Sequence, residues 1–545
     1  MSSGIQEPRL GTYGDTDSCQ IMSLTRDLFA QTSLYCRLRD ETVFVAEPDE
    51  PYRHSSSRLH PSEHLLHLLW QRQDLPRQPL KTFDDRPLTV YRPGRWMRAH
   101  GPDFQDAKVR LADSAIRVGA VEVHVWASDW FRHGHDRDVA YTKVLLHVVW
   151  QNDLGARSAV DASGRQIPQI VLSEFLMMGL PELQGLLEEE NPPVRTETPT
   201  TPCQRSLQGM PAEAIGQLLD MAGEERWRQK ANRFALRAER RGVEQALYES
   251  LLEALGFQGN RLPFWQLARL APVEQIRAAM NGTGPTPIQL QAILYGVSGF
   301  LQRWQAMWRT RPPELDAYLT TLLTHWAPLV PYFPECLDER QWRTAGIRPA
   351  NAPQRRIAAA SYLLAGLSQQ TLMDRFLGPL RGLDGRASRP QLRSCQRELA
   401  RRLRVTGEAD FWGRRYAITG AEHDRPIDLL GAGRASTMVV DILLPAAAAL
   451  AQLGQEAINL DVVRTLYRSY PRLPGNEVTR DVLRQFFGTD PDRRSIVDSA
   501  CRQQGLIQLY RDFCLNELET CQECVFPRLV ARLEGAQRGM PPAAP

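Results

Sequence analysis

The stretch GAVEVHVW at residues 119–126 constrains the fold of this chain more than any other segment. Its three valines alternate with Glu122, His124 and Trp126, which is the two-residue period of a β-strand. The valine face must pack on a core, and the opposite face brings Glu122 and His124 side by side. The pattern therefore predicts a strand that is apolar on one face and carries a polar pair on the other.

The residues around this strand predict a small α/β unit. SEHLLHLLWQR at 62–72 predicts a short helix capped by Ser62, with its leucines and Trp70 on one face. Strand patterns follow at 88–91, 104–111, 116–126 and 144–150, and 136–142 predicts a helical turn before the last of them. The predicted order is helix, three strands, helix, strand. A further strand is predicted at 42–46.

The second half of the chain has a different pattern. NPPVRTETPTTP at 191–202 has the composition of a linker, and the sequence beyond Pro211 has amphipathic, helical periodicity. With 545 residues and 43% apolar residues, the chain is folded and too long for one core. We therefore expect a multidomain protein, α/β plus all-α, with an appendage at 1–58, an α/β core at 59–175, a linker at 176–210 and a helical region at 211–545.

Asp103 can join the polar pair on the strand. In GPDF, Gly101 and Pro102 can turn the chain, which places Asp103 at the mouth of the preceding strand. If the two strands pair, Asp103, Glu122 and His124 converge on one cation. The alternative is a buried polar cluster that only fixes the turn and the strand register.

Pro102-Asp103 followed by Glu122-x-His124, in an αβββαβ order, resembles the PD-(D/E)XK phosphodiesterase superfamily. The resemblance implies a restriction-endonuclease-like core and a metal-dependent nuclease acting on DNA or RNA, with Mg²⁺ or Mn²⁺ at the carboxylates. Glu63 matches an extra acidic ligand of some members. His124 stands where lysine is usual, which shifts metal preference toward Mn²⁺ or Zn²⁺. A binding module that has lost catalysis is the alternative.

Four longer stretches resemble a bacterial family catalogued as domain of unknown function 2851. They are GPDFQDAKV, GAVEVHVWASDWFRHGHDRDVAYTKVLLHVVWQND, IRPANAPQRRIAAASYLL and QQGLIQLYRDFCLNELETCQEC. Together they span most of residues 60–525. This resemblance implies kinship and no particular activity.

SDWFRHGHDRD at 128–138 holds a second group of chemical side chains. His133, His135 and Asp138 have a spacing that suits zinc or general acid–base work, which would make the protein a zinc-dependent hydrolase. The alternative is that Ser128 and Asp129 cap the turn and the histidines are structural. His147 alternates with apolar neighbours and is expected in the core.

The cysteines near the end have metal-ligand spacing. Cys514, Cys521 and Cys524 form C-x6-C-x2-C, which suits Zn²⁺ or an iron–sulfur cluster. A fourth ligand would be Cys501, which is nearest in sequence, or Cys36, since some RecB-type nucleases join a cysteine before the core to a distant triplet. Unligated thiols are the alternative.

A basic stripe marks residues 226–241. Arg226, Lys230, Arg233, Arg237 and Arg241 recur every three or four residues on one helix face. The stripe could bind phosphate, but we favour a solvated face partnered by Glu224, Glu225 and Glu239.

Global properties point to a cytoplasmic protein. The net charge of +3 makes no electrostatic case for or against nucleic acid. We expect no signal segment and no membrane span, because the most apolar stretch, 438–453, contains Asp441 and Pro445 and is interpreted as a buried helix pair. The sequence names no protein partner.

Overall fold

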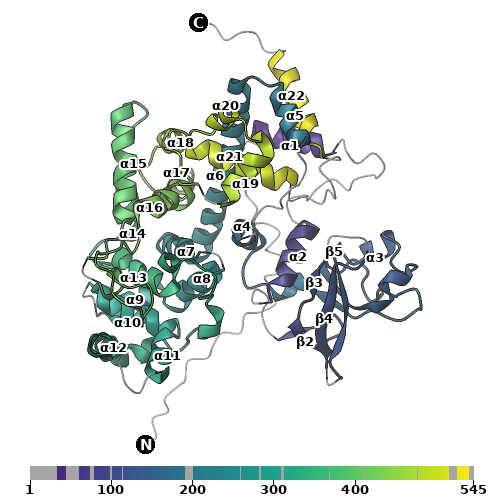
Figure 1. The fold of residues 1–545 in the computed structure, drawn as a ribbon, viewed down its shortest axis with the longest axis horizontal. Helices are drawn as coiled ribbons and strands as arrows, with labels where there is room; N and C mark the ends of the chain where they lie inside the picture. Colours follow the sequence, from purple (N-terminus) through teal and green to yellow (C-terminus); the bar gives the residue numbers. More distant parts are fainter. Residues whose placement is uncertain are drawn as a thin grey trace, which may run out of the picture.

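The computed structural model describes residues 33–44, 61–73, 79–97, 101–112, 114–190, 201–257, 259–281, 284–307, 312–367, 369–408, 410–475, 477–514 and 524–538. Figure 1 shows a part built around a sheet beside a larger part made of helices. The fold is thus mixed α/β followed by α, as the sequence predicts.

One mixed sheet organises the α/β part. The strands are β1 (Leu80–Lys81), β2 (Pro87–Arg92), β3 (Arg95–Trp96), β4 (Phe104–Leu111), β5 (Arg117–Trp126), β6 (Val144–Gln151) and β7 (Gln169–Val171). Their order is β1-β2-β4-β5-β6-β7, with β3 paired to β4. β2, β4 and β5 are antiparallel neighbours, whereas β6 runs parallel to β5 and β7 parallel to β6.

One helix precedes the sheet, and further helical segments connect two of its parallel strands. Helix α2 (Glu63–Gln71) precedes the sheet, and α3 (Asp129–Arg132) with the 3₁₀ turn η2 (Val139–Lys143) joins β5 to the parallel β6. The predicted turn at 136–142 corresponds to η2. The sequence patterns had missed β1, β3, α3 and β7, which are too short to show a period.

The core of the α/β part lies between α2 and the sheet. Ser62 caps α2 by accepting from the Leu65 N–H, as predicted. Leu66, Leu69 and Trp70 are fully buried and pack in one cluster with residues of β4 and β5. Helix α4 (Leu180–Glu190) adds its leucines to the same cluster. The packing holds the valine face of β5 inward, so its polar face is turned to the other side of the sheet.

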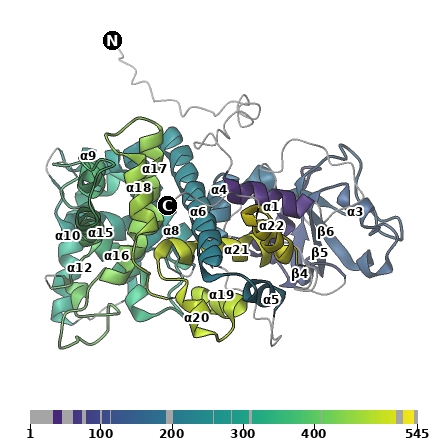
Figure 2. The ribbon, with the colours of Figure 1, turned by 90° about the horizontal axis from the view of Figure 1, so that it is seen from above.

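Long helix α6 is the centre of the helical part and packs against α17 and α21 (Figure 2). The helices are α5 (Pro202–Gln208), α6 (Ala212–Arg241), α7 (Val243–Leu255), α8 (Arg261–Leu270), α9 (Val273–Ala279), α10 (Pro287–Val297), α11 (Phe300–Met307), α12 (Pro313–Trp326), α13 (Pro353–Leu364), α14 (Leu372–Leu377), α15 (Arg389–Leu403), α16 (Ala432–Met438), α17 (Leu444–Gln452), α18 (Leu460–Arg468), α19 (Glu477–Phe487), α20 (Pro491–Ser495), α21 (Ala500–Cys514) and α22 (Phe526–Arg538).

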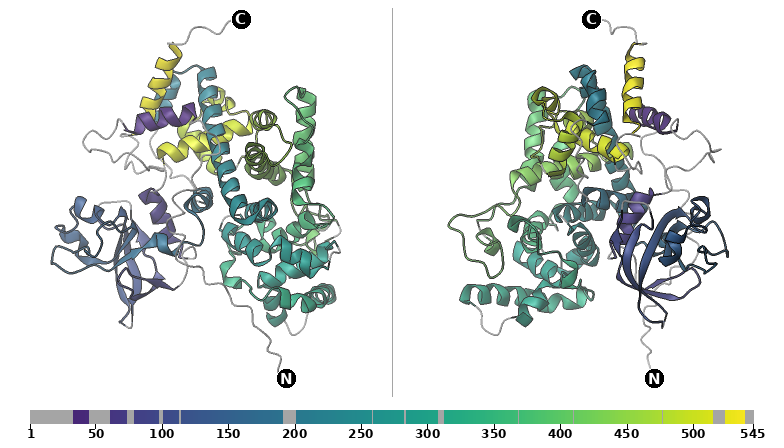
Figure 3. Two further views of the ribbon diagram at one scale, coloured as in Figure 1. Left: turned by 180° about the vertical axis from the view of Figure 1, so that it is seen from behind. Right: turned by 45° about the vertical axis from the view of Figure 1, so that its right-hand side comes forward.

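The N-terminal segment corrects one prediction. Residues 42–44, predicted to begin a strand, end helix α1 (Leu34–Phe44) instead; residues 45 and 46 lie outside the described residues. Helix α1 packs beside α22 and α6 (Figure 3). The Tyr35 hydroxyl donates to Asp512 at 2.7 Å. Because Tyr35 and Cys36 are buried in that contact, α1 is part of the helical core and not an appendage.

Two further segments differ from expectation. The stretch 176–210, expected to be a linker, contains α4 and α5. The apolar stretch expected to form a helix pair is one continuous helix over 432–452, with the π-helical turn η9 (Val439–Leu443) between α16 and α17. That helix is long and apolar enough to span a membrane, but 67% of its most apolar window is buried inside the fold.

Candidate metal centre

Strand β5 carries two polar side chains that are buried on one face of the sheet. Glu122 and His124 point to the same face, and only 5% and 1% of their surfaces are exposed. Parallel pairing with β6 brings in a third group, because His147 lies opposite Glu122 in the register. The His124 Nδ1 and His147 Nε2 atoms lie 2.9 Å apart and share one hydrogen bond. That bond orients the His124 ring so that Nε2 faces away from β6.

The segment after β5 folds back over this face. Asp129 accepts from the Trp126 N–H at 3.1 Å, and the buried Trp130 donates to the Val160 carbonyl at 2.8 Å, which fixes α3 against the end of the sheet. Gly134 then has a φ of 75°, the left-handed conformation that glycine adopts most readily. This turn lets the histidines on both sides of it face His124.

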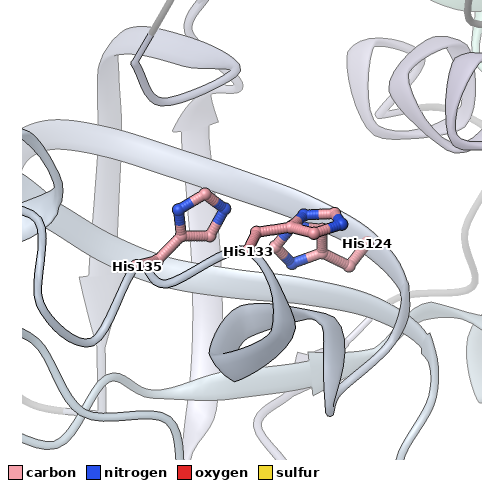
Figure 4. A group of neighbouring side chains, drawn as sticks. All are labelled: His124, His133 and His135. Atoms are coloured by element: carbon pink, nitrogen blue, oxygen red, sulfur yellow. The ribbon is translucent and has the colours of Figure 1, made fainter.

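Three imidazoles meet at that point (Figure 4). One ring nitrogen from each of His124, His133 and His135 lies within 4.8 Å of the other two. His133 Nδ1 is 3.2 Å from His124 Nε2. The ring of His135 is parallel to that of His124, with centroids 5.2 Å apart. The prediction that His133 and His135 form one group suited to zinc binding or acid–base chemistry therefore has a geometric basis.

The carboxylate of Glu122 faces the imidazoles. Its Oε1 lies 3.3 Å from His135 Nε2 and 3.6 Å from His124 Nε2. Its Oε2 accepts from the Asp103 N–H at 3.0 Å. In a tetrahedral zinc site with bonds of about 2.0–2.1 Å, neighbouring ligand atoms are roughly 3.3 Å apart. The Glu122 Oε1 atom is near this spacing from the imidazoles of His124 and His135, and one nitrogen from each of the three imidazoles lies within 4.8 Å of the others.

The protonation states favour metal binding. Burial, followed by the neighbouring imidazoles, holds the pKa of His124 well below its ordinary value, and burial lowers the pKa of His135 to about 4. Both rings are thus neutral near pH 7, which is the form that binds metals. Burial and, second, the charge of Asp103 raise the pKa of Glu122 well above its ordinary value. A cation beside Glu122 would reverse that shift.

Asp103 lies close to this group but uses its oxygens elsewhere. Its Oδ2 accepts from the Val123 N–H at 2.9 Å, and its Oδ1 lies 3.0 Å from His67 Nε2 on α2. The structure therefore brings Asp103, Glu122 and His124 close together, with Asp103 joined to Glu122 through its backbone N–H, but the Asp103 carboxylate does not face the three imidazoles as the shared-cation prediction requires. Glu63, one helical turn before His67, is near enough to affect the pKa of Glu122.

Asp138 does not join the histidines. It is exposed, and its side chain accepts from the Ala140 N–H as the cap of η2. Asp138 is thus a capping residue here.

Two residues at the site were missed by the sequence patterns. His67 was placed on the apolar helix α2 without a role, although its spacing of four from Glu63 puts both on one helix face. Tyr141 stacks on His135, with ring centroids 3.8 Å apart and an angle of 23°. No local pattern signals Tyr141, because the contact depends on how η2 folds back.

The structure separates the predicted cysteine ligands. Cys501 and Cys514 lie at opposite ends of α21, roughly 20 Å apart at 1.5 Å per residue, so they cannot bind one ion. The prediction that Cys501 supplies the fourth ligand is therefore wrong. Cys36, the alternative, shares a core cluster with Cys514 and Cys524. Cys521 lies outside the described residues.

Comparison with known proteins gives one match. The sequence model of a family described as "Protein of unknown function (DUF2851)" matches residues 63–472, which include every histidine and carboxylate of the centre. No curated protein and no solved structure matches the chain.

Proposed function

The chain belongs to the DUF2851 family, and from the geometry of its site we propose that it is a metal-dependent hydrolase that cleaves phosphodiester bonds in nucleic acid. One observation carries the proposal. One nitrogen from each of three imidazoles, which come from a strand and the loop after it, lies within 4.8 Å of the other two, and the Glu122 carboxylate lies beside two of these rings.

The donor set indicates which metal would bind. Imidazole nitrogen suits Zn²⁺ and other transition ions, whereas Mg²⁺ prefers oxygen ligands and near-ideal octahedral geometry. Three imidazoles and one carboxylate therefore favour Zn²⁺ or Mn²⁺ over Mg²⁺. A divalent ion held there supplies a Lewis acid that polarises the phosphoryl oxygen of a substrate.

The surrounding residues have roles that do not depend on the identity of the metal. His147 orients the ring of His124 through their shared hydrogen bond, as partners of metal-binding histidines commonly do. His67 and Asp103 form a pair at 3.0 Å in which His67 Nε2 can give or take a proton. This pair lies beside Glu122 and is the proposed acid–base group of the reaction.

The preference for phosphodiesters rests on the arrangement of the core. Helix α2, three antiparallel strands, a helical crossover and the parallel strand β6 follow the αβββαβ order of the PD-(D/E)XK proteins. Asp103 directly precedes the second of these strands, and Glu122 and His124 lie on the third. This placement supports a nuclease-like core in which His124 takes the place of lysine.

The proposal is tested with the purified full chain. Its zinc and manganese content is measured, and cleavage of single- and double-stranded DNA and RNA is followed with Mn²⁺, Zn²⁺ or Mg²⁺. We expect cleavage that Glu122→Gln abolishes and His423→Ala, an exposed histidine of the helical part, leaves unchanged. Metal bound by the wild type without cleavage of any of these substrates would favour a binding module that lacks catalysis.

A further inference from the structure

The basic stripe of α6 is covered by other helices. The prediction of a solvated face there is wrong, because tertiary packing buries Arg226 and Lys230. The carboxylates that pair with the stripe come from other helices, since Lys230 Nζ lies 2.5 Å from Asp441 Oδ1 and Arg237 binds Glu253 of α7 at 2.9 Å. Exposed positive charge lies elsewhere in the molecule.

Basic side chains gather on the open face of strand β4. Lys108 and Arg110 are exposed and alternate with the buried Val109, so both point away from the core of the α/β part. Arg92 of β2 is the register partner of Lys108, and partners in an antiparallel pair lie on the same face. Three positively charged side chains therefore share this face.

Strand β3 adds a fourth basic side chain. Trp96 lies opposite the buried Phe104 in the register and stacks on its ring, so Trp96 is on the core face. Its neighbour Arg95 is exposed and lies on the other face, beside Gln105. We call the surface formed by Arg92, Arg95, Lys108 and Arg110 the basic face.

The charge of the basic face is not balanced by carboxylates. Strands β2, β3 and β4 contain these four basic residues and one acidic residue, Asp106. None of the four forms an ion pair within the residues that the structure describes. Arg92 Nε does donate a hydrogen bond at 2.9 Å, but the acceptor is the backbone carbonyl of Asp106. The face therefore attracts anions, and most strongly those with several regularly spaced charges.

An aromatic ring lies on the same face. Tyr91 stands at the irregularity of β2 between Val90 and Arg92, and 48% of its surface is exposed. The Arg110 guanidinium lies 5.8 Å from the centroid of its ring. Surfaces that bind single-stranded nucleic acid combine cations that follow the phosphates with aromatic rings on which bases stack. A duplex would leave Tyr91 without a base to stack on, because its bases are already stacked on one another.

The basic face ends beside the metal centre. Val118 is 60% exposed and pairs with Lys108, and it lies on the same face of β5 as Glu122. The two residues are four apart, roughly 13 Å at about 3.3 Å per residue. Ala120, between them, is covered by Trp130 of the crossover. A strand bound on the basic face would therefore reach the edge of the cover over the metal centre.

We propose that the basic face binds single-stranded nucleic acid, with phosphates on its four basic side chains and one base stacked on Tyr91. The proposal rests on the proposed function in taking nucleic acid as the substrate, and it adds the strandedness of that substrate and the surface that holds it. Binding on this surface needs no metal, so it can be measured when no cleavage occurs.

The test is fluorescence anisotropy of labelled oligothymidylate with the full chain in EDTA, at several salt concentrations. Four phosphate contacts predict a slope of log affinity against log salt of about −2.8, at about −0.7 per contact. The double variant Lys108→Gln/Arg110→Gln should bind at least about tenfold more weakly, and its slope should be smaller by about 1.4. The matched control Arg393→Gln/Arg397→Gln, which removes two exposed arginines of α15, should keep both values.

A second variant tests stacking separately from charge. Tyr91→Ala should weaken oligothymidylate binding about tenfold and leave the salt slope unchanged, while Tyr91→Phe should bind as the wild type does. Tyr332→Ala, which changes an exposed tyrosine of the helical part, should have no effect. Circular dichroism confirms that each variant is folded.

The outcomes separate this surface from the hydrolase proposal. Absence of oligothymidylate binding, equal binding by both double variants, or a duplex bound as tightly as the single strand would overturn the proposal. Binding to phosphatidylserine vesicles in place of oligothymidylate would also overturn it. Binding that depends on Lys108 and Arg110, without cleavage in any metal, would support the surface and contradict the hydrolase. Cleavage that keeps its wild-type KM in Lys108→Gln/Arg110→Gln would contradict the surface and support the hydrolase.

Discussion

Oε1 of Glu122 lies 3.3 Å from Nε2 of His135, although a strand end and a helix separate the two residues along the chain. Both atoms are buried, and His135 Nε2 makes no hydrogen bond within the part of the chain that the structure describes. An ion bound between the buried Glu122 carboxylate and the neutral His135 imidazole would give a partner to the polar atoms of both.

Removing an imidazole should release the metal. We expect His135→Ala and His133→Ala to lower the bound metal from about one ion per chain to a small fraction, since each change removes one of the three imidazole ligands. Inductively coupled plasma mass spectrometry after dialysis measures the change. His423→Ala is the control. Equal metal content in all four proteins would contradict the proposed centre.

The turn at Gly134 should be needed for the site and not only for stability. Gly134→Ala forces an L side chain into the left-handed region, at a cost of about 1–2 kcal/mol. We expect reduced metal content together with a modest loss of thermal stability. Gly155→Ala is a matched control, because Gly155 also has a positive φ and open space around its Cβ position. It should lose similar stability and keep its metal.

His67 should affect the reaction without affecting the metal. His67→Asn removes the group that faces Asp103, and we expect the turnover rate to fall about 100-fold or more. Metal content should remain that of the wild type. A loss of metal in this variant would mean that His67 is a ligand and not an acid–base residue.

The buried histidines should make stability depend on pH. Burial lowers the pKa of His147 to about 3, whereas it is about 6.5 in the unfolded chain. Between these values only the unfolded state binds the proton, so the free energy of unfolding rises with pH there and is lost as pH falls from 6.5 toward 3. The slope from His147 is at most about 1.4 kcal/mol per pH unit. The free energy of unfolding, measured with denaturant in EDTA at several pH values, should change less with pH for His147→Gln than for wild type or His423→Gln.

The predicted metal site at the cysteines can be tested with two control cysteines that lie elsewhere in the fold. If Cys36, Cys514 and Cys524 hold zinc or an iron–sulfur cluster, Cys524→Ser should lose that metal and the exposed Cys336→Ser should not. Cys501→Ser should also keep it, because Cys501 lies at the far end of α21. An absorption spectrum and metal analysis distinguish iron from zinc. Equal metal content in Cys524→Ser and wild type would contradict the prediction.

The sequence by itself determined the elements whose residues carry their own period. Strand β5, the facing pair of Glu122 and His124, and helix α2 with its Ser62 cap follow from alternation, helical spacing and a cap, which are properties of neighbouring residues. The same local reasoning recognised His133 and His135 as a chemical group.

Only the tertiary structure decided which polar groups share one site. Asp138 caps a turn, Asp103 pairs with His67, and Cys501 is separated from Cys514, because each of these outcomes depends on where distant elements pack. The basic stripe of α6 illustrates the reason. Its spacing is the same on a solvated helix and on a buried one, and the carboxylates that bind it come from α4, α7 and η9, whose approach is fixed by packing of the whole helical core.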